Sequence, residues 1–126
     1  MIPKFIRAFE ASAAITGRRI VAFSDVAASS KIAMAASATA PAFGVSDPMG
    51  ADLGGMCDVV MAGLASVELG GTVTAGQPIM TDAQGRAIAA TAAAASTRRV
   101  IGFATEPGVI GDFIDVWLAP SLLDRA

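Results

Sequence analysis

The chain has 126 residues, which suits one domain with a single hydrophobic core. Hydrophobic residues make up 54% of it and charged residues only 16%, against roughly 25% charged in an average soluble domain. The formal net charge is −2 and there is no run of basic residues, so the chain lacks the clustered Lys and Arg of a direct DNA- or RNA-binding protein.

The mean hydropathy of +0.62 raises the question of a membrane span, which needs about 20 consecutive apolar residues. The longest uncharged stretch, Ile32 to Ser46, is broken by Pro41 and by hydroxyl residues. Between the N-terminal charges, the apolar patch Ala11 to Ile15 is too short for a signal peptide. We therefore expect a soluble protein that stays in the cytoplasm where it is made, with no membrane partner and with some apolar surface covered by another protein.

The first 15 residues have an ambiguous pattern. Their apolar residues fit helical spacing, but Phe5, Arg7 and Phe9 also fit one face of a strand. Pro3 favours an extended conformation. We expect residues 1–15 to form an N-terminal arm, with a strand in the chain's own barrel as the alternative.

Short strand signals follow along the rest of the chain. Each is bounded by Gly, Pro, Asp or Ser, a pattern typical of an all-β sandwich or barrel with little helix. The predicted strands are Arg19–Phe23, Lys31–Ala35, Ala42–Val45, Met56–Ala62, Ala65–Leu69, Pro78–Thr81, Arg86–Ala90, Arg99–Ala104 and Asp112–Leu118.

Two of these elements have especially clear local signals. Between the sixth and seventh predicted strands, residues 82–85 read Asp-Ala-Gln-Gly, which indicates a hairpin turn. In the last strand apolar residues alternate, so Ile114, Val116 and Leu118 are expected to face the core. Phe113 and Trp117 then point to the other side.

The sequence also contains an internal repeat. Residues 43–48 and 55–62 resemble residues 101–107 and 111–119, at a separation of about 58 residues. The likeness begins upstream, at Thr16 in one copy and Ala75 in the other. We expect a single domain over residues 16–126, built from two related β-units at about 16–63 and 75–120.

Candidate catalytic and metal-binding patterns are weak. The chain has no histidine, which removes the usual base of most hydrolases. Gly71 to Gly76 has the glycine spacing of a phosphate loop but is followed by Gln77-Pro78 instead of Lys and Ser or Thr. Cys57, in a strand context, is expected to be structural. No catalytic, cofactor-binding or metal-ligating residue is predicted.

Acidic and basic residues near strand ends leave two alternatives open. Asp47, Asp52 and Asp58 could form a carboxylate cluster, but no known ligand spacing matches and turn residues are the simpler interpretation. Arg18-Arg19 could pair with carboxylates on a neighbouring subunit or remain solvated at a strand end.

The order of these patterns over residues 1 to 121 resembles that of capsid cement, or head decoration, proteins of tailed bacteriophages and prophages. The resemblance is carried by strand and turn residues, and it transfers no active site. The segments that carry it are Gly44–Asp47, Asp58–Val73, Thr81–Ala87 and Gly111–Pro120.

The resemblance implies a small β-barrel or β-tulip that trimerises on the exterior of an expanded capsid. There it would brace adjacent subunits of the major capsid protein as a non-enzymatic component of the virion, made in the cytoplasm of the host bacterium. The terminal arm commonly takes part in such contacts. The residues expected at the capsid or subunit interface are Ile2, Pro3, Lys4, Phe5, Ile6, Arg7, Phe9, Arg18 and Arg19.

Two rival functions remain at the level of sequence. A trimeric β-barrel nucleotide hydrolase of the dUTPase type would need an aspartate with Mg²⁺, and the chain lacks the ordered glycine and serine motifs of that class. Another structural component of the head or tail would share the same composition. No cofactor is expected for the cement function.

Overall fold

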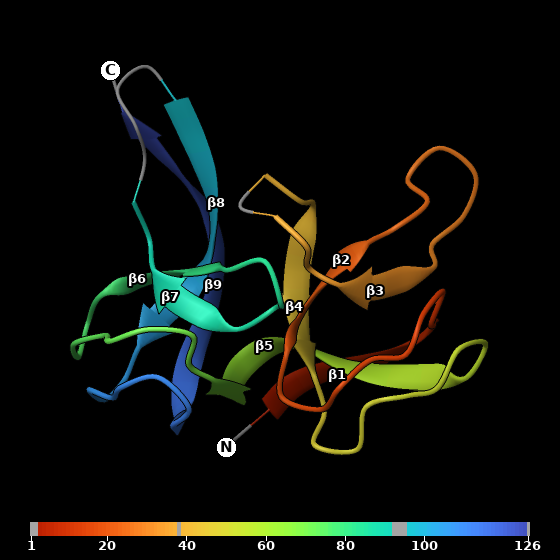
Figure 1. The fold of residues 1–126 in the computed structure, drawn as a ribbon, viewed down its shortest axis with the longest axis horizontal. Helices are drawn as coiled ribbons and strands as arrows, with labels where there is room; N and C mark the ends of the chain where they lie inside the picture. The colour runs from red at the N-terminus through yellow and green to blue at the C-terminus, as the bar shows by residue number, and fades with distance from the viewer. Residues whose placement is uncertain (1–2, 38, 92–95, 126) are drawn as a thin grey trace.

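The computed structural model describes residues 3–37, 39–91 and 96–125, and these residues contain strands, turns and bends but no helix. The all-β prediction is confirmed: the strands form a curled antiparallel sheet shaped like a half-barrel (Figure 1). The strands are β1 (Pro3–Glu10), β2 (Ile20–Phe23), β3 (Ile32–Met34), β4 (Ala42–Ser46), β5 (Met56–Glu68), β6 (Pro78–Thr81), β7 (Ala87–Ala89), β8 (Ser96–Ala104) and β9 (Phe113–Arg125).

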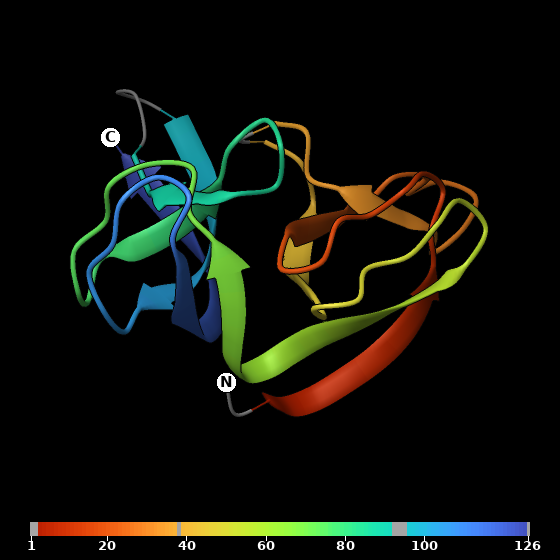
Figure 2. The same ribbon diagram turned by 60° about the horizontal axis from the view of Figure 1, so that its bottom comes forward.

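The strand order along the sheet is β3-β2-β4-β5-β9-β8-β6-β7, and β1 pairs with β5 outside this path. The first half of β5 pairs with β1, and its second half, from Gly63 onward, pairs with β9. Gly63 has φ 86°, a backbone conformation that glycine adopts without steric penalty. At this point β5 changes partner without ending, and Figure 2 shows the bent ribbon beside β1.

Strand pairing follows the same plan twice along the chain. In a first unit, β2 pairs with β3 and β4, β4 pairs with β5, and β5 pairs with β1. In a second unit, β6 pairs with β7 and β8, β8 pairs with β9, and β9 pairs with the second half of β5. The position of β1 in the first unit is therefore equivalent to the position of the second half of β5 in the second unit.

Hydrogen bonds in the connecting loops repeat the same correspondence. The amide of Gly54 donates to the carbonyl of Ala11 at 2.9 Å, and the amide of Gly111 donates to that of Leu69 at 2.9 Å. Both glycines have positive φ, 80° and 90° respectively. The two units thus share their loop geometry as well as their strand pairing.

The equivalence also explains the one described non-glycine residue with positive φ. Arg18 has φ 60° and donates its amide to the carbonyl of Ser46 at 3.3 Å. In the second unit Gly76 has φ 81° and donates to the carbonyl of Ala104 at 2.7 Å. Arg18 therefore occupies a turn position for which the second unit uses glycine.

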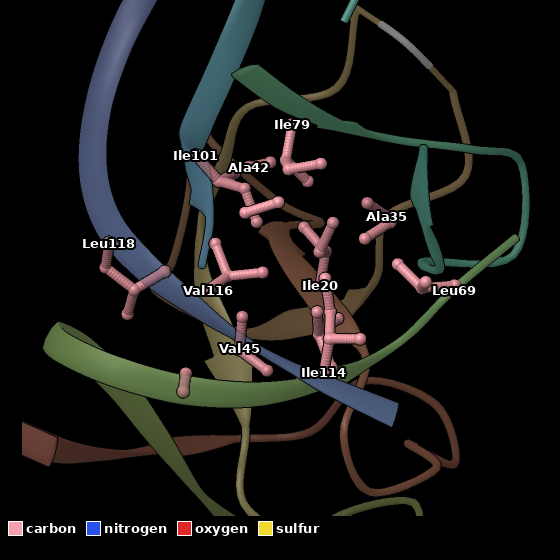
Figure 3. Close-up of a cluster of buried hydrophobic side chains, with 14 of the residues drawn as sticks. Ile20, Ala35, Ala42, Val45, Leu69, Ile79, Ile101, Ile114, Val116 and Leu118 are labelled. Carbon is pink, nitrogen blue, oxygen red and sulfur yellow. The ribbon is translucent and has the colours of Figure 1, made fainter. Parts of the chain in front are cut away.

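Most of the buried side chains belong to one core shared by the two units. Ile20 and Val45 of the first unit pack with Ile79 and Ile101 of the second (Figure 3). Ile114, Val116 and Leu118 of β9 lie in this core, as their alternation predicts. Because both units contribute to one core, they are held in a fixed relation to each other.

A second apolar cluster lies within the first unit, on the other face of β5. Neighbouring residues of β5 divide between the two clusters: Val60 faces the shared core, and Val59 faces the second cluster. Phe9 of β1 also lies in the second cluster, with Phe23 and Phe43 packed against it. Val59 and Val60 are therefore buried on opposite faces of β5.

Several strand boundaries differ from the predicted ones, and the differences at β5 and β9 are the most consequential. The segments Met56–Ala62 and Ala65–Leu69 were expected as separate strands but form the single strand β5, because Gly63 bends the backbone without breaking it. The last strand was expected to end at Leu118 but continues to Arg125, paired with β8. A register shift opposite Pro120 accommodates the missing amide of proline.

Candidate interaction surface

The expected interface residues of the N-terminal segment lie on β1, which pairs with β5 of the same chain. Residues 3–10 thus adopt the alternative conformation, a strand in the chain's own sheet. Phe5 is 56% exposed and Ile6 49% exposed, and Arg7 is also exposed. Pro3 and Lys4 form the start of the strand, and Ile2 lies outside the described residues.

Phe9 has a different environment from the rest of β1. It is 4% exposed, and its ring meets those of Phe23 and Phe43 edge-on at centroid distances of 5.8 and 5.1 Å. The guanidinium of Arg7 lies 4.7 Å from the Phe9 ring centroid. Within this chain, Phe9 therefore anchors β1 to the body, and the surface that β1 offers a partner is formed by Phe5, Ile6 and Arg7.

The predicted arginine pair is engaged with the chain's own second unit. Arg19 forms an ion pair with Glu68 at 3.2 Å and donates a second hydrogen bond to the carbonyl of Gln84 at 2.9 Å. The guanidinium of Arg18 lies over the ring of Phe113, 5.0 Å from its centroid. Both side chains therefore join the two units, in place of the free strand end that one interpretation of the sequence expected.

An apolar surface is also present on the outer side of β5, β8 and β9. Trp117 is 56% exposed, its ring lies 6.0 Å from that of Phe103, and it stands opposite Leu64 in the strand register. We call Leu64, Phe103 and Trp117 the outer aromatic face. It was not among the expected interface residues, although the alternation along β9 already indicated that Trp117 points away from the core.

The described residues contain no group of three or more Cys, Asp or Glu side chains that could hold a metal ion. Instead, Asp47 accepts hydrogen bonds from the amides of Met49 and Gly50, and Asp112 accepts one from the amide of Val109. These carboxylates stabilise loops, in agreement with the simpler interpretation of the acidic residues.

An open hollow of about 320 Å³ lies between β4 and the ends of β8 and β9. Among the described residues that line it, the polar side chains are those of Arg99 and Ser121, and none is a carboxylate. The metal-assisted nucleotide hydrolysis considered above would require an acidic residue at such a site. The hollow therefore does not have the composition of a dUTPase-type site.

Cys57 is fully buried in the second apolar cluster. Burial, with smaller contributions from the carboxylates of Asp47 and Asp58, raises the pKa of its thiol from 9.0 to about 11. A raised thiol pKa stabilises the fold at pH values below the unfolded-state pKa, and this contribution is lost as the pH rises from about 9 through about 11.

We expect the free energy of unfolding to fall between pH 9 and 11 in the wild type and to fall less in Cys57→Ala, as measured by urea denaturation. The chain has no tyrosine, so no phenol titration overlaps with that of Cys57 in this range. An identical pH profile in the two proteins would contradict the prediction. Native Cys57 should also react slowly with a thiol reagent below pH 9.

A family model described as phage cement protein matches residues 5–113, which is most of the chain. The chain belongs to the phage cement protein family. The match confirms the resemblance seen in the sequence. The family is one of phage structural proteins and is not an enzyme family.

A solved structure supports the same fold. The head fiber gp8.5 N base of bacteriophage phi29 superposes with a TM-score of 0.68 at 21% sequence identity, over 91% of this chain and 93% of that one. At this identity the likeness concerns the fold alone. No curated protein matches the chain. Among the described residues, no helix is long and apolar enough to cross a membrane.

Proposed function

We propose that this chain binds the outer surface of an expanded phage capsid, as a homotrimer, and stabilises the contacts between neighbouring subunits of the major capsid protein. The observation that carries the proposal is the membership of the phage cement protein family over most of the chain. Such a protein works by adding interface that exists only in the assembled shell, so its binding favours the shell over separated subunits by mass action.

The surface of the chain supports this role. Large apolar side chains are exposed on β1 and on the outer aromatic face, while only 16% of all residues are charged. Exposed Trp and Phe side chains of this kind are typical of protein–protein contact sites. We therefore assign Phe5 and Ile6 of β1, and Trp117 of the outer aromatic face, to contacts with the capsid or with a second subunit.

The direct experiment adds the purified chain to expanded capsids that lack it, with unexpanded capsids as the control. We expect saturable binding to the expanded shell, counted as copies per particle after sedimentation, and a higher temperature of shell disruption. An absence of binding to expanded shells would refute the proposal. Light scattering of the free protein tests the trimer, because a dimer would contradict it.

Trp117→Ser provides a test at a single residue. Trp117 is more than half exposed, so we expect the free energy of unfolding to change by less than about 1 kcal/mol. Binding to expanded capsids should weaken by at least about tenfold, because exposed tryptophans often dominate protein interfaces. The matched control is Leu122→Ser, which removes a side chain that is 68% exposed on the extended β8–β9 ribbon. Equal binding by both variants and the wild type would remove Trp117 from the interface.

A second structural role has a specific observation in its favour. The structural neighbour is described as the N base of a head fiber, and we infer from it a second role for this chain, that of carrying a further virion component. For this chain, that role predicts that a further virion protein copurifies with it in a fixed ratio on the particle. Decoration by this chain alone, at a copy number that saturates the shell, favours the cement role.

A further inference from the structure

Each of the two units has a loop between two of its strands that carries exposed apolar side chains. Residues 47–55 connect β4 to β5, and residues 105–112 connect β8 to β9. The exposed residues at the first loop are named tip 1. The exposed residues at the second loop are named tip 2. Tip 1 consists of Met49, Leu53 and Met56, which are 89%, 72% and 63% exposed. Tip 2 consists of Val109, Ile110 and Phe113, which are 53%, 61% and 54% exposed.

The tips occupy equivalent positions in the two units. Gly54 follows Leu53 and Gly111 follows Ile110, and these two glycines make the corresponding amide hydrogen bonds described above. Met56 begins β5 just as Phe113 begins β9. Loop ends are normally rich in small and polar residues, so large apolar side chains at the same place in both units require an explanation.

Both loops are fixed to the body of the protein by the amides of Gly54 and Gly111, which donate to carbonyls outside the loops, and each loop is also held from within by an aspartate. Asp47 accepts two loop amides, from Met49 at 3.2 Å and from Gly50 at 3.1 Å. In the other loop, Asp112 accepts the amide of Val109 at 3.0 Å. The exposed side chains are therefore carried on ordered loops, which reduces the entropy lost when they bind a partner.

The two tips lie in different halves of the molecule, with the loop at residues 47–55 on the right and the loop at 105–112 on the left in both Figure 1 and Figure 2. Their relative placement is fixed, because β5 runs continuously from one unit into the other and both units share one core. A rigid body with two separated contact points of like chemistry can bridge two binding sites of the same kind.

We propose that tip 1 and tip 2 bind equivalent apolar sites on two neighbouring copies of one repeating partner, so that each chain is bivalent. The inference rests on the proposed function, because a capsid shell presents many copies of the same subunit surface at fixed spacing. Each tip alone makes a small contact, and the rigid link between the tips converts two weak contacts into one strong attachment.

The test compares three variants on expanded capsids that lack this protein. The first carries Leu53→Ser with Met56→Ser, the second carries Val109→Ser with Ile110→Ser, and the third combines all four changes. We expect each single-tip variant to bind about 100-fold more weakly than the wild type, at the low end of avidity gains from bivalent attachment. The losses at the two tips should be similar, and the combined variant should not bind at all.

A matched control is Val26→Ser, which removes another loop side chain, 71% exposed, outside both tips. Its binding should equal that of the wild type, and all variants should keep the wild-type melting temperature. Loss of binding at one tip only, or wild-type binding by every variant, would overturn bivalence. A changed oligomeric state in the tip variants would also overturn it, because the tips would then be subunit contacts. Failure of the wild type to bind would instead refute the proposed function, and the bivalent attachment that rests on it.

Discussion

Phe9→Ala is expected to lower the free energy of unfolding by about 3–5 kcal/mol, the usual cost of deleting a buried phenylalanine ring. Phe9 is 4% exposed, and the rings of Phe23 and Phe43, which stack on each other at 4.1 Å, enclose it. Removing it leaves a cavity where β1 meets the body. Urea denaturation measures the loss, and hydrogen exchange should show that the β1 amides become less protected.

Phe5→Ala is the control on the same strand. Phe5 is 56% exposed, so its loss should change the free energy of unfolding by less than about 1 kcal/mol. If β1 contacts the capsid as proposed, Phe5→Ala weakens binding to expanded shells while the protein stays folded. Equal destabilisation by the two substitutions would contradict the structural distinction between an anchor and an exposed residue on β1.

Gly102→Ala is expected to destabilise the fold by about 3 kcal/mol, at the upper end of typical overpacking costs. A methyl group on Gly102 would clash with the carbonyl oxygen of Trp117 and would lie 3.0 Å from the Cα of Leu118. These are backbone atoms of the paired strand β9, so they cannot move aside without opening the β8–β9 pairing. Thermal or urea unfolding measures the effect.

The first unit contains the same constraint. A methyl group on Gly44 of β4 would meet the carbonyl oxygen of Val60 on β5 at 2.7 Å, so Gly44→Ala should be destabilising as well. Gly71→Ala is the matched control, because its nearest contact would be the side chain of Ile88 at an ordinary 3.6 Å. If Gly71→Ala lowered the free energy of unfolding as much as Gly102→Ala does, the replacement of any glycine would explain the result. The close approach of the two strands would then not be its cause.

Local sequence patterns were sufficient for most strands. The hairpin at residues 82–85 forms because Asp82 accepts the amides of Gln84 and Arg86, while Gly85 adopts φ 74°. These interactions join residues close in sequence, so their signal lies within a short window. The burial of Ile114 and Val116 and the exposure of Trp117 on the other face also follow from a local pattern, because side chains alternate along a strand.

The candidate surface was only partly accessible from sequence. Phe5 and Phe9 have the same residue type and share one face in an ideal strand, yet one is exposed and the other buried. The difference arises because Phe9 meets Phe23 and Phe43, and those partners are brought there by long-range pairing of β2 and β4. Similarly, Arg19 finds Glu68 and Gln84 only when the two units fold together.

By itself, the sequence determined an all-β chain with short strands, a repeated pattern and the family of phage cement proteins, because these depend on residue types and their spacing along the chain. Only the tertiary structure decided that β1 completes the first unit, that Gly63 lets β5 serve both units, and which apolar side chains stay exposed. Those features depend on which distant strands pair and what they bury, which no local pattern specifies.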